Sequence, residues 1–383
     1  MGNGWSTVAI REVAFPVQRP EKPTPGREYR QIGVRLWGDG TYERESLDGA
    51  ATQYSVLHRV EADDIIVNKI WARHGSVSVV PPNLAGCYCS GEFPLFRPDE
   101  ARILPRWFYW MMKTRWFWKE CEIASRGTTS KSRIRPEAFA SITIPLPDRN
   151  QQCRIVAKLD ALAAKIEAAR KNKREIEQKA EAILHSAYAR IVNGAPLHKM
   201  DDIAPLIRRE VEVRMGEEYP ELGIRSFGKG TFHKPALDYL SVGTKRLFKI
   251  EPGGLLFSNV FAWEGAIAVA QPEDEGRFGS HRFITCVPKQ GIVTAEFLRF
   301  YFLTDEGLRK IGEASPGGAG RNRTLGLAKL AAIEVPVPAY KKQIWFNRLQ
   351  AKVRELLTIQ QEAEIELNAM LPSILDKAFK GEL

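Results

Sequence analysis

The chain contains an internal repeat with a period of about 190 residues. Residues 29–41 read YRQIGVRLWGDGT and residues 219–231 read YPELGIRSFGKGT, so glycine, arginine and threonine recur in one register. The same register joins residues 64–76 to residues 254–266. This period is much longer than the roughly 20–50 residues of solenoid repeats. The sequence therefore predicts two copies of one domain, which suits a chain of 383 residues.

Each copy is predicted to be a globular part followed by a long helix. The globular parts combine short β-rich runs with glycine and proline turns. Each also holds an aromatic segment with helical spacing, at residues 107–112 and 297–302, which we expect to pack on the sheet of its own domain. The fold class is thus α+β, with two α/β domains in tandem. The domains are expected at residues 1–148 and 195–338, and the helical spacers at 149–194 and 339–383.

The spacing of apolar residues predicts two long amphipathic helices. Residues 151–192 contain neither proline nor glycine, and their apolar residues recur every three or four positions. Residues 343–370 repeat the pattern, after which the helix either continues past Pro372 or breaks there. Because a helix with one apolar stripe is unstable alone in water, we expect an antiparallel coiled-coil pair that separates two domains related by a pseudo-two-fold axis. The alternative is that each helix packs onto its own domain.

The net charge of +10 suits a polyanionic partner, although many soluble proteins share such an excess. Half of it lies on residues 149–194, which carry 10 basic and 5 acidic side chains. The basic side chains of this helix are expected to lie along a phosphate backbone, to contact an acidic partner subunit or to be exposed to solvent, and the sequence leaves these alternatives open. The sequence has no apolar run of about 18 residues and begins without a signal pattern, so a cytoplasmic protein that does not enter a membrane is expected. The five cysteines do not suggest a disulfide framework.

Three pairs of segments are candidates for contact with DNA. The first pair is residues 125–135, which hold four basic and no acidic side chains, and the glycine-rich residues 315–324. Arginine binds guanine, and asparagine binds adenine, through two hydrogen bonds, although a plain surface loop is the alternative. The second pair, residues 68–75 and 258–265, keeps its alanine and glycine but differs at polar positions. Such a difference is expected of two readers of different bases.

The third pair surrounds Arg35 and Arg225, whose recurrence suits a phosphate contact or a structural ion pair better than a choice of base. Trp37 and Trp71 are expected in the core rather than at DNA. The candidate DNA contacts are Arg35, Lys69, Arg73, His74, Arg126, Thr128, Lys131 and Arg133 in the first copy, and Arg225, Lys229, Asn259, Trp263, Arg321, Asn322 and Arg323 in the second. Candidate partner contacts, chosen as residues on the outer face of the first helix, are Lys165, Arg170 and Lys173.

The sequence lacks the motifs that would indicate an enzyme. It has no G-x-x-x-x-G-K-[ST] phosphate loop and no glycine-rich dinucleotide fingerprint after a strand. The Asp/Asn-Pro-Pro-aromatic tetrapeptide that an amino-methyltransferase needs is also missing. Cys87 and Cys89 are too close together for a standard zinc pair, and no second pair follows. A chain without catalytic residues and without a metal site is expected.

Three segments resemble the specificity subunits of type I restriction-modification systems. Residues 371–383, LPSILDKAFKGEL, look like the C-terminal signature of that family, and residues 184–194 are a degenerate internal copy. Residues 144–160, with IPLP before QCRIVAKLD, match the entry to its first spacer helix, whereas the second copy at 343–349 departs further. The repeat and the placement of the helices agree with these segments, so the resemblance covers the whole chain.

The resemblance implies a division of labour among subunits. Each domain would read one half of a split, asymmetric site in double-stranded DNA, and the helices would fix the gap between the halves. Two methyltransferase (modification) subunits would dock on this chain and carry S-adenosylmethionine, and restriction subunits would use ATP and magnesium. No cofactor would then belong to this chain. The alternative function is a helical adaptor whose two repeat domains bind protein partners.

Overall fold

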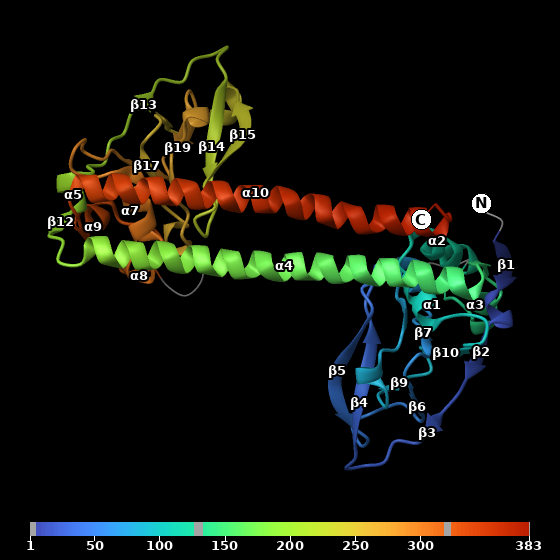
Figure 1. Ribbon diagram of the computed structural model, residues 1–383. Helices are drawn as coiled ribbons and strands as arrows, with labels where there is room; N and C mark the ends of the chain where they lie inside the picture. The colour runs from blue at the N-terminus through green and yellow to red at the C-terminus, as the bar shows by residue number, and fades with distance from the viewer. Residues whose placement is uncertain (1–4, 126–132, 318–322, 383) are drawn as a thin grey trace. The chain divides into compact units, whose positions relative to one another are not determined.

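The computed structural model describes residues 5–125, 133–317 and 323–382. The chain divides into two compact units: unit 1 comprises Met1–Lys173 and Gln360–Leu383, and unit 2 comprises Arg174–Ile359. Helix α4 (Arg149–Val192) begins in unit 1 and ends in unit 2, whereas α10 (Tyr340–Phe379) begins in unit 2 and ends in unit 1 (Figure 1). Each unit therefore contains a segment of both long helices.

Unit 1 is built on a five-stranded sheet with the order β3-β6-β9-β4-β5 and a four-stranded sheet with the order β2-β10-β7-β8. A two-stranded sheet of β1 and β11 ties the start of the chain to the strand that precedes α4. The strands are β1 (Ser6–Ala9), β2 (Ala14–Val17), β3 (Pro20–Glu21), β4 (Glu28–Val34), β5 (Thr41–Asp48), β6 (Leu57–Arg59), β7 (Ile65–Val67), β8 (Val77–Val79), β9 (Tyr88–Cys89), β10 (Leu95–Pro98) and β11 (Thr143–Leu146). The helices are η1 (Ile10–Glu12), η2 (Ala72–His74), η3 (Pro82–Leu84), α1 (Pro105–Met111), α2 (Arg115–Ala124) and α3 (Pro136–Ala140).

Unit 2 repeats this plan with a five-stranded sheet in the order β13-β16-β19-β14-β15 and a three-stranded sheet in the order β18-β17-β20. In place of a fourth strand, Leu206 forms a single bridge with Cys286, 190 residues after the pair Pro16 and Phe96 of unit 1. The strands are β12 (Leu197–Lys199), β13 (Glu210–Val211), β14 (Tyr219–Ile224), β15 (Thr231–Leu237), β16 (Leu247–Lys249), β17 (Leu255–Ser258), β18 (Ile267–Val269), β19 (Phe278–Ser280), β20 (Phe283–Cys286) and β21 (Glu334–Pro336). The helices are α5 (Met200–Ile203), α6 (Tyr239–Val242), η4 (Ala262–Glu264), η5 (Pro272–Asp274), α7 (Ala295–Phe302), α8 (Asp305–Ala314) and α9 (Leu327–Ala331).

The two aromatic segments are helices, α1 and α7, as the sequence predicts. Trp107 of α1 and Phe297 of α7 are fully buried in the main core of their units. α1 packs on β8 and α7 packs on β18, so each covers the smaller sheet. Burying such a ring stabilises the fold by about 2–3 kcal/mol. The main core of each unit therefore forms between its smaller sheet and its helices.

The antiparallel pairing of the two long helices is confirmed. In unit 1, Arg170 donates a hydrogen bond to Asn368, and Lys173 forms an ion pair with Glu364. Residue numbers therefore rise along α4 as they fall along α10, so the two helices are antiparallel. In unit 2, the ring of Tyr188 lies 6.1 Å from that of Phe346. The ends of the helices also enter the cores of both units. α10 continues through Pro372, which settles the choice between a continued and a broken helix.

The apolar stripe of the two long helices is buried only in part. Ile155 and Leu159 are buried in the core of unit 1. By contrast, Ile176 and Ile183 on α4 are exposed. Leu356, Ile359 and Ile365 on α10 are exposed as well. The apolar spacing predicted the helices correctly, but a second helix covers only one side of each.

Candidate nucleic-acid interface

The hairpin of β4 and β5 in unit 1 is built around a stack of three residues. Gly33 pairs with Tyr42 across the strands, and the ring of Tyr42 lies over the glycine, where a Cβ atom would be 2.6 Å from it. The guanidinium of Arg35 lies over the same ring, 4.7 Å from its centroid, and Nη1 donates to the carbonyl of Thr41 (3.1 Å). Cation–π contacts of this kind contribute about 0.5–1 kcal/mol at exposed sites. Arg35 thus has a structural role in the hairpin through a ring and a carbonyl, and its contact with phosphate stays a prediction.

The tip of this hairpin holds an aromatic residue in an unfavourable backbone conformation. Trp37 has φ 61° and Gly38 has φ 72°, and the amide of Asp39 donates to the carbonyl of Leu36 (3.2 Å). Two central residues with positive φ and this hydrogen bond form the pattern of a type I′ turn. Left-handed backbone at a bulky residue costs about 1–3 kcal/mol. The Trp37 side chain is nevertheless 58% exposed.

The expectation that Trp37 and Trp71 belong to the core is therefore wrong. Both side chains are exposed, and each lies beside the ring of His74, with centroids 5.5 Å and 5.8 Å away. A tryptophan in a basic protein is usually assigned to the core because burial of its large ring is favourable. A positive φ, which would have marked Trp37 as unusual, cannot be read from composition or periodicity. The structure instead forms a surface cluster of these three rings.

The hairpin tip of unit 1 is bound to the turn at residues 68–75. The amide of Trp37 donates to the carbonyl of His74 (2.7 Å), and that of Gly38 donates to the carbonyl of Gly75 (3.1 Å). Lys113, which the sequence did not single out, donates from Nζ to the carbonyl of Gly38 (2.5 Å). Gly75 has φ 75°, and a Cβ there would be 2.7 Å from Trp118, so only glycine fits this junction. Two predicted segments are thus joined in one rigid surface.

The described end of the segment at residues 125–135 meets the same turn. The amide of Ile134 donates to the carbonyl of Lys69 (2.9 Å), and Nζ of Lys69 donates to the carbonyl of Gly91 (2.6 Å). Arg133 is exposed and forms an ion pair with Glu92 (3.1 Å). The candidate residues Arg126, Thr128 and Lys131 lie outside the described residues. The described residues of all three candidate segments of the first copy therefore meet at this turn.

The side chains of the turn in unit 1 are polar and basic. Nε of Arg73 lies 3.2 Å from Nε2 of His74, so the imidazole and the guanidinium are held side by side. Oδ1 of Asn68 accepts hydrogen bonds from the amides of Ile70 and Trp71, which fixes the turn from within. Arginine and histidine donate to acceptor atoms of bases and phosphates. The turn thus combines a fixed backbone with partly exposed arginine and histidine side chains.

The hairpin of unit 2 repeats the scaffold of unit 1. Gly223 pairs with Phe232, whose ring lies 4.8 Å from the guanidinium of Arg225, and Nη1 of Arg225 donates to the carbonyl of Thr231 (2.7 Å). At the tip, Phe227 has φ 61° and is 75% exposed, and Nζ of Lys229 lies 5.9 Å from the centroid of its ring. The same strained and exposed aromatic residue therefore occurs twice.

The tip of unit 2 is also bound to the matching turn. The amides of Phe227 and Gly228 donate to the carbonyls of Glu264 and Gly265, each at 2.8 Å. The carbonyl of Gly228 accepts a hydrogen bond from Nη2 of Arg299 (2.5 Å). Burial, together with a neighbouring guanidinium, lowers the pKa of Arg299. Arg299 stands 186 residues after Lys113, outside the register of the repeat, so the repeat alone did not reveal either residue.

The turn of unit 2 presents different side chains from those of unit 1. The guanidinium of Arg323 stacks 5.3 Å from the ring centroid of Trp263, and the carboxylate of Glu264 accepts from Oγ of Ser226 (3.2 Å). The carbonyl of Asn259 accepts from the amide of Leu325 (2.9 Å), but its side-chain Oδ1 is buried without a hydrogen-bond partner. That placement does not favour base reading by Asn259. Arg321 and Asn322 lie outside the described residues.

The helix residues chosen as partner contacts are placed differently from expectation. Lys165 is exposed, as predicted for an outer face. Arg170 and Lys173 instead face α10, where they bind Asn368 and Glu364. The assumption that all three lie on the outer face is wrong because a basic residue in a helix pair can also cross the interface. The ion pair in turn lowers the pKa of Glu364, chiefly through its hydrogen bond with Lys173.

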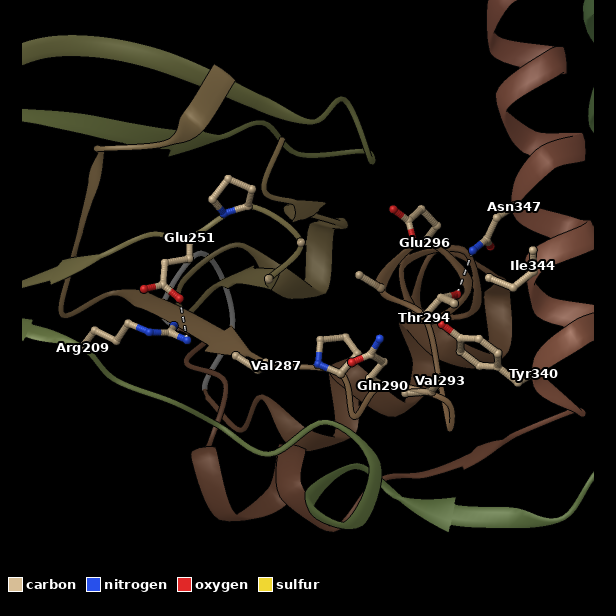
Figure 2. A pocket seen from close by; sticks show the side chains of 15 residues that line it. Arg209, Glu251, Val287, Gln290, Val293, Thr294, Glu296, Tyr340, Ile344 and Asn347 are labelled. Atoms are coloured by element: carbon tan, nitrogen blue, oxygen red, sulfur yellow. Dashed lines mark hydrogen bonds and ion pairs between the residues drawn. The ribbon is translucent and has the colours of Figure 1, made fainter. Parts of the chain in front are cut away.

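Unit 2 also contains a pocket of about 390 Å³ between the loop at residues 251–254, the start of α7 and the start of α10 (Figure 2). Arg209 and Glu251 form an ion pair at one side (2.8 Å), and Nδ2 of Asn347 donates to Oγ1 of Thr294 at the other (2.9 Å). Among the described residues, no group of three or more His, Cys, Asp or Glu side chains is arranged to hold a metal. In the same part of the chain, no helix combines the length and apolarity of a membrane span.

Comparisons with known proteins agree with the two-unit organisation. A family model described as type I restriction modification DNA specificity domain matches residues 3–178. No curated protein matches the chain. The HsdS subunit from Thermoanaerobacter tengcongensis has a similar fold, with a TM-score of 0.60 and 20% identity over 100% of this chain and 98% of that one. A structure that describes complex assembly and conformational transition of the type I R-M system is similar with a TM-score of 0.69 and 19% identity over 100% and 99% of the chains.

The matched domain covers unit 1 up to the middle of α4, and the similar folds extend over both units. Residues 3–178 thus match the type I restriction modification DNA specificity domain, and the fold of the chain is similar to that of an HsdS subunit.

Proposed function

We propose that this chain reads a bipartite, asymmetric site in double-stranded DNA, one half with each unit, and docks two methyltransferase subunits. It contributes specificity without catalysis. S-adenosylmethionine would be bound by the methyltransferase subunits, and ATP and magnesium by restriction subunits that join through them. The structural neighbour that belongs to a type I R-M assembly supports such partners.

One observation carries the proposal of two readers. In each unit the hairpin tip, the turn and the following loop are joined by matching backbone hydrogen bonds, yet the turn carries Arg73 and His74 in one unit and Trp263 and Glu264 in the other. A shared backbone fixes the position on the duplex, and the differing side chains select different bases. Each good bidentate contact discriminates by about 1–3 kcal/mol.

The test is a binding selection from random duplex DNA with the assembled complex of this chain and its methyltransferase subunits. The proposal expects an enriched motif with two specified parts and a fixed unspecified gap. An enriched motif with a single part would contradict the two readers. Binding without any sequence preference would instead favour the adaptor function, in which the two units bind proteins.

The gap is proposed to be fixed by the helices α4 and α10, which both pass from one unit to the other. An insertion of four residues after Lys173 adds about 6 Å of helix, which exceeds one base-pair step of about 3.4 Å. The insertion should shift the accepted gap or abolish binding. Selection of the original gap by the insertion variant would refute this role of the helices.

Partner docking is proposed at the exposed apolar residues of the helices in unit 2, namely Ile176, Ile183, Leu356 and Ile359. Their exposure on paired helices leaves apolar faces uncovered, which is typical of protein interfaces. The double substitution Ile176→Asp and Ile183→Asp should prevent co-purification of the methyltransferase subunits. Leu197→Asp, an exposed position in β12 of the same unit, is the matched control. Retained co-purification of the double variant would move the docking surface elsewhere.

A further inference from the structure

The two hairpin tips carry aromatic residues where a turn of this kind favours others. Type I′ turns require positive φ at both central residues and favour Asn-Gly, Asp-Gly or Gly-Gly. Here the central pairs are Trp37-Gly38 and Phe227-Gly228, and both aromatic residues have φ 61°. A bulky residue with such a φ is a rare exception. Its occurrence at the same position of both units makes a chance local irregularity a poor explanation.

The fold does not compensate for this strain by burying the rings. The side chain of Phe227 is 75% exposed, and within the described part of the chain the cation that contacts its ring is Lys229, two residues away. Trp37 makes more contacts, with the rings of His74 and Trp118, but remains mostly exposed. Strained backbone persists where the surrounding structure imposes it, and it occurs preferentially at ligand contacts. A contact of these rings with a binding partner would explain both why they are exposed and why the strained backbone is kept.

The tips are fixed rather than loose. Two amides of each tip are bound to the neighbouring turn, and the glycine carbonyl is bound by Lys113 in unit 1 and by Arg299 in unit 2. These two cations stand at positions that do not correspond in the repeat, yet they bind the same carbonyl of the turn. The aromatic ring is therefore presented at a defined position, which lowers the entropic cost of its contact with a partner.

The surroundings of the tips favour nucleic acid as the partner. Each tip is bound to the turn that carries the candidate base readers. A basic side chain is part of both tips: Lys113 binds the carbonyl of Gly38 in unit 1, and Lys229 lies beside the ring of Phe227 in unit 2. Aromatic rings stack on bases, and apolar side chains enter base-pair steps of a duplex. We propose that Trp37 and Phe227 stack against base pairs of their own half-sites and partly open a base-pair step there. This inference rests on the proposed reading of DNA by the two units.

The experiment uses the complete complex and the duplex that the wild-type complex selects. 2-Aminopurine is placed in turn at each position of both half-sites, outside the adenine that becomes methylated, because the methyltransferase can flip that base by itself. Wild type should raise the fluorescence at one step of each half-site. Phe227→Asn should abolish the rise in one half only and weaken binding by roughly tenfold or more. Trp37→Asn should do the same in the other half.

The Asn variants separate a DNA contact from a structural role, because asparagine suits a type I′ turn. Phe227→Asn should leave the unfolding temperature unchanged or raise it while DNA binding falls. Leu240→Asn, at a position in α6 that is 82% exposed, is the matched control and should change neither. An unchanged affinity and fluorescence in both Asn variants would overturn the inference. Loss of the methyltransferase subunits from these variants would also overturn it, in favour of a protein contact.

The failure of the proposed function would be seen earlier, in the wild-type selection. If the Phe227→Asn and Trp37→Asn complexes select the same two-part motif with full affinity, the proposal of two readers stands and only the stacking contact is refuted. A wild-type complex without sequence preference removes the two readers and this inference with them.

Discussion

The turns at residues 68–75 and 258–265 share their backbone but differ in the side chains that they present. Both end in a left-handed glycine whose carbonyl accepts the amide of a hairpin glycine. In unit 1 the residues before that glycine are Arg73 and His74, whereas in unit 2 they are Trp263 and Glu264. The comparison teaches that different residues determine the backbone geometry of the turn and the side chains that it presents. The glycines fix the backbone, and the two residues before the last glycine differ between the units.

The arginine at the end of the loop that follows, Arg133 in unit 1 and Arg323 in unit 2, also keeps its position in the repeat while its contacts differ. Arg133 forms an ion pair with Glu92, and Arg323 stacks on the ring of Trp263. Two equivalent cations of the repeat are thus held by different chemistry. An exposed ion pair contributes little free energy, so Arg133 can exchange Glu92 for DNA. Arg323 is oriented by a ring, which leaves its hydrogen-bond donors available.

The largest effect is expected where the two units agree most closely, at a buried glutamine near the start of each long helix. Gln152 accepts from the amide of Leu104 and donates to the carbonyls of Arg102 and Pro147, and it is fully buried. Gln343 makes the same three bonds in unit 2, and is equally buried. Replacement of either by alanine leaves buried backbone groups unpaired and should lower the free energy of unfolding by about 3 kcal/mol.

Urea unfolding, with hydrogen exchange to locate the loss, measures this effect. Gln152→Ala should weaken protection in unit 1, and Gln343→Ala in unit 2. Gln151→Ala, next to the buried residue and itself only partly buried, is the control and should change stability little. A large loss in one unit and none in the other would break the structural equivalence of the two units.

The next effect concerns the glycines beneath the hairpin rings. A Cβ atom at Gly33 would be 2.6 Å from the ring of Tyr42, and one at Gly223 would be 2.2 Å from the ring of Phe232. Either alanine substitution should displace the ring from its arginine and cost about 1–3 kcal/mol, as other overpacked sites do. Thermal unfolding of both variants measures the cost. If one variant is neutral, its hairpin does not depend on the stack of glycine, ring and arginine.

An effect of the same order, on DNA binding instead of stability, is expected from the loop arginines, and it should fall on one half-site at a time. Arg133→Ala should weaken or relax recognition of the half-site read by unit 1, and Arg323→Ala that of the half-site read by unit 2, each by about 1–3 kcal/mol if a bidentate base contact is lost. Binding of the assembled complex to duplexes altered in one half measures this. Equal weakening at both half-sites would contradict the model of two readers.

How far the sequence predicted this site depends on which signal each residue left. The repeat identified Gly75 and Gly265, because a turn that needs left-handed backbone restricts the residue type. The periodicity of apolar residues predicted the long helices. It did not predict which of these apolar residues are buried, since Ile176 and Leu356 have the same spacing as buried positions but are exposed. Exposure of a large aromatic residue depends on tertiary packing, so the core assignment of Trp37 was wrong.

The last and smallest prediction separates the helix pairs of the two units by their chemistry. In unit 1 the ion pair with Lys173 lowers the pKa of Glu364, chiefly through a hydrogen bond. A lowered pKa in the folded state means that this pair adds stability above the ordinary titration range of glutamate, near about pH 4.3, and loses it as the pH falls through the lowered value. Glu364→Gln should remove that part of the pH dependence of urea unfolding. Tyr188→Phe, in the ring contact of unit 2, should leave it intact, and an equal pH profile of Glu364→Gln and wild type would show that the pair adds nothing.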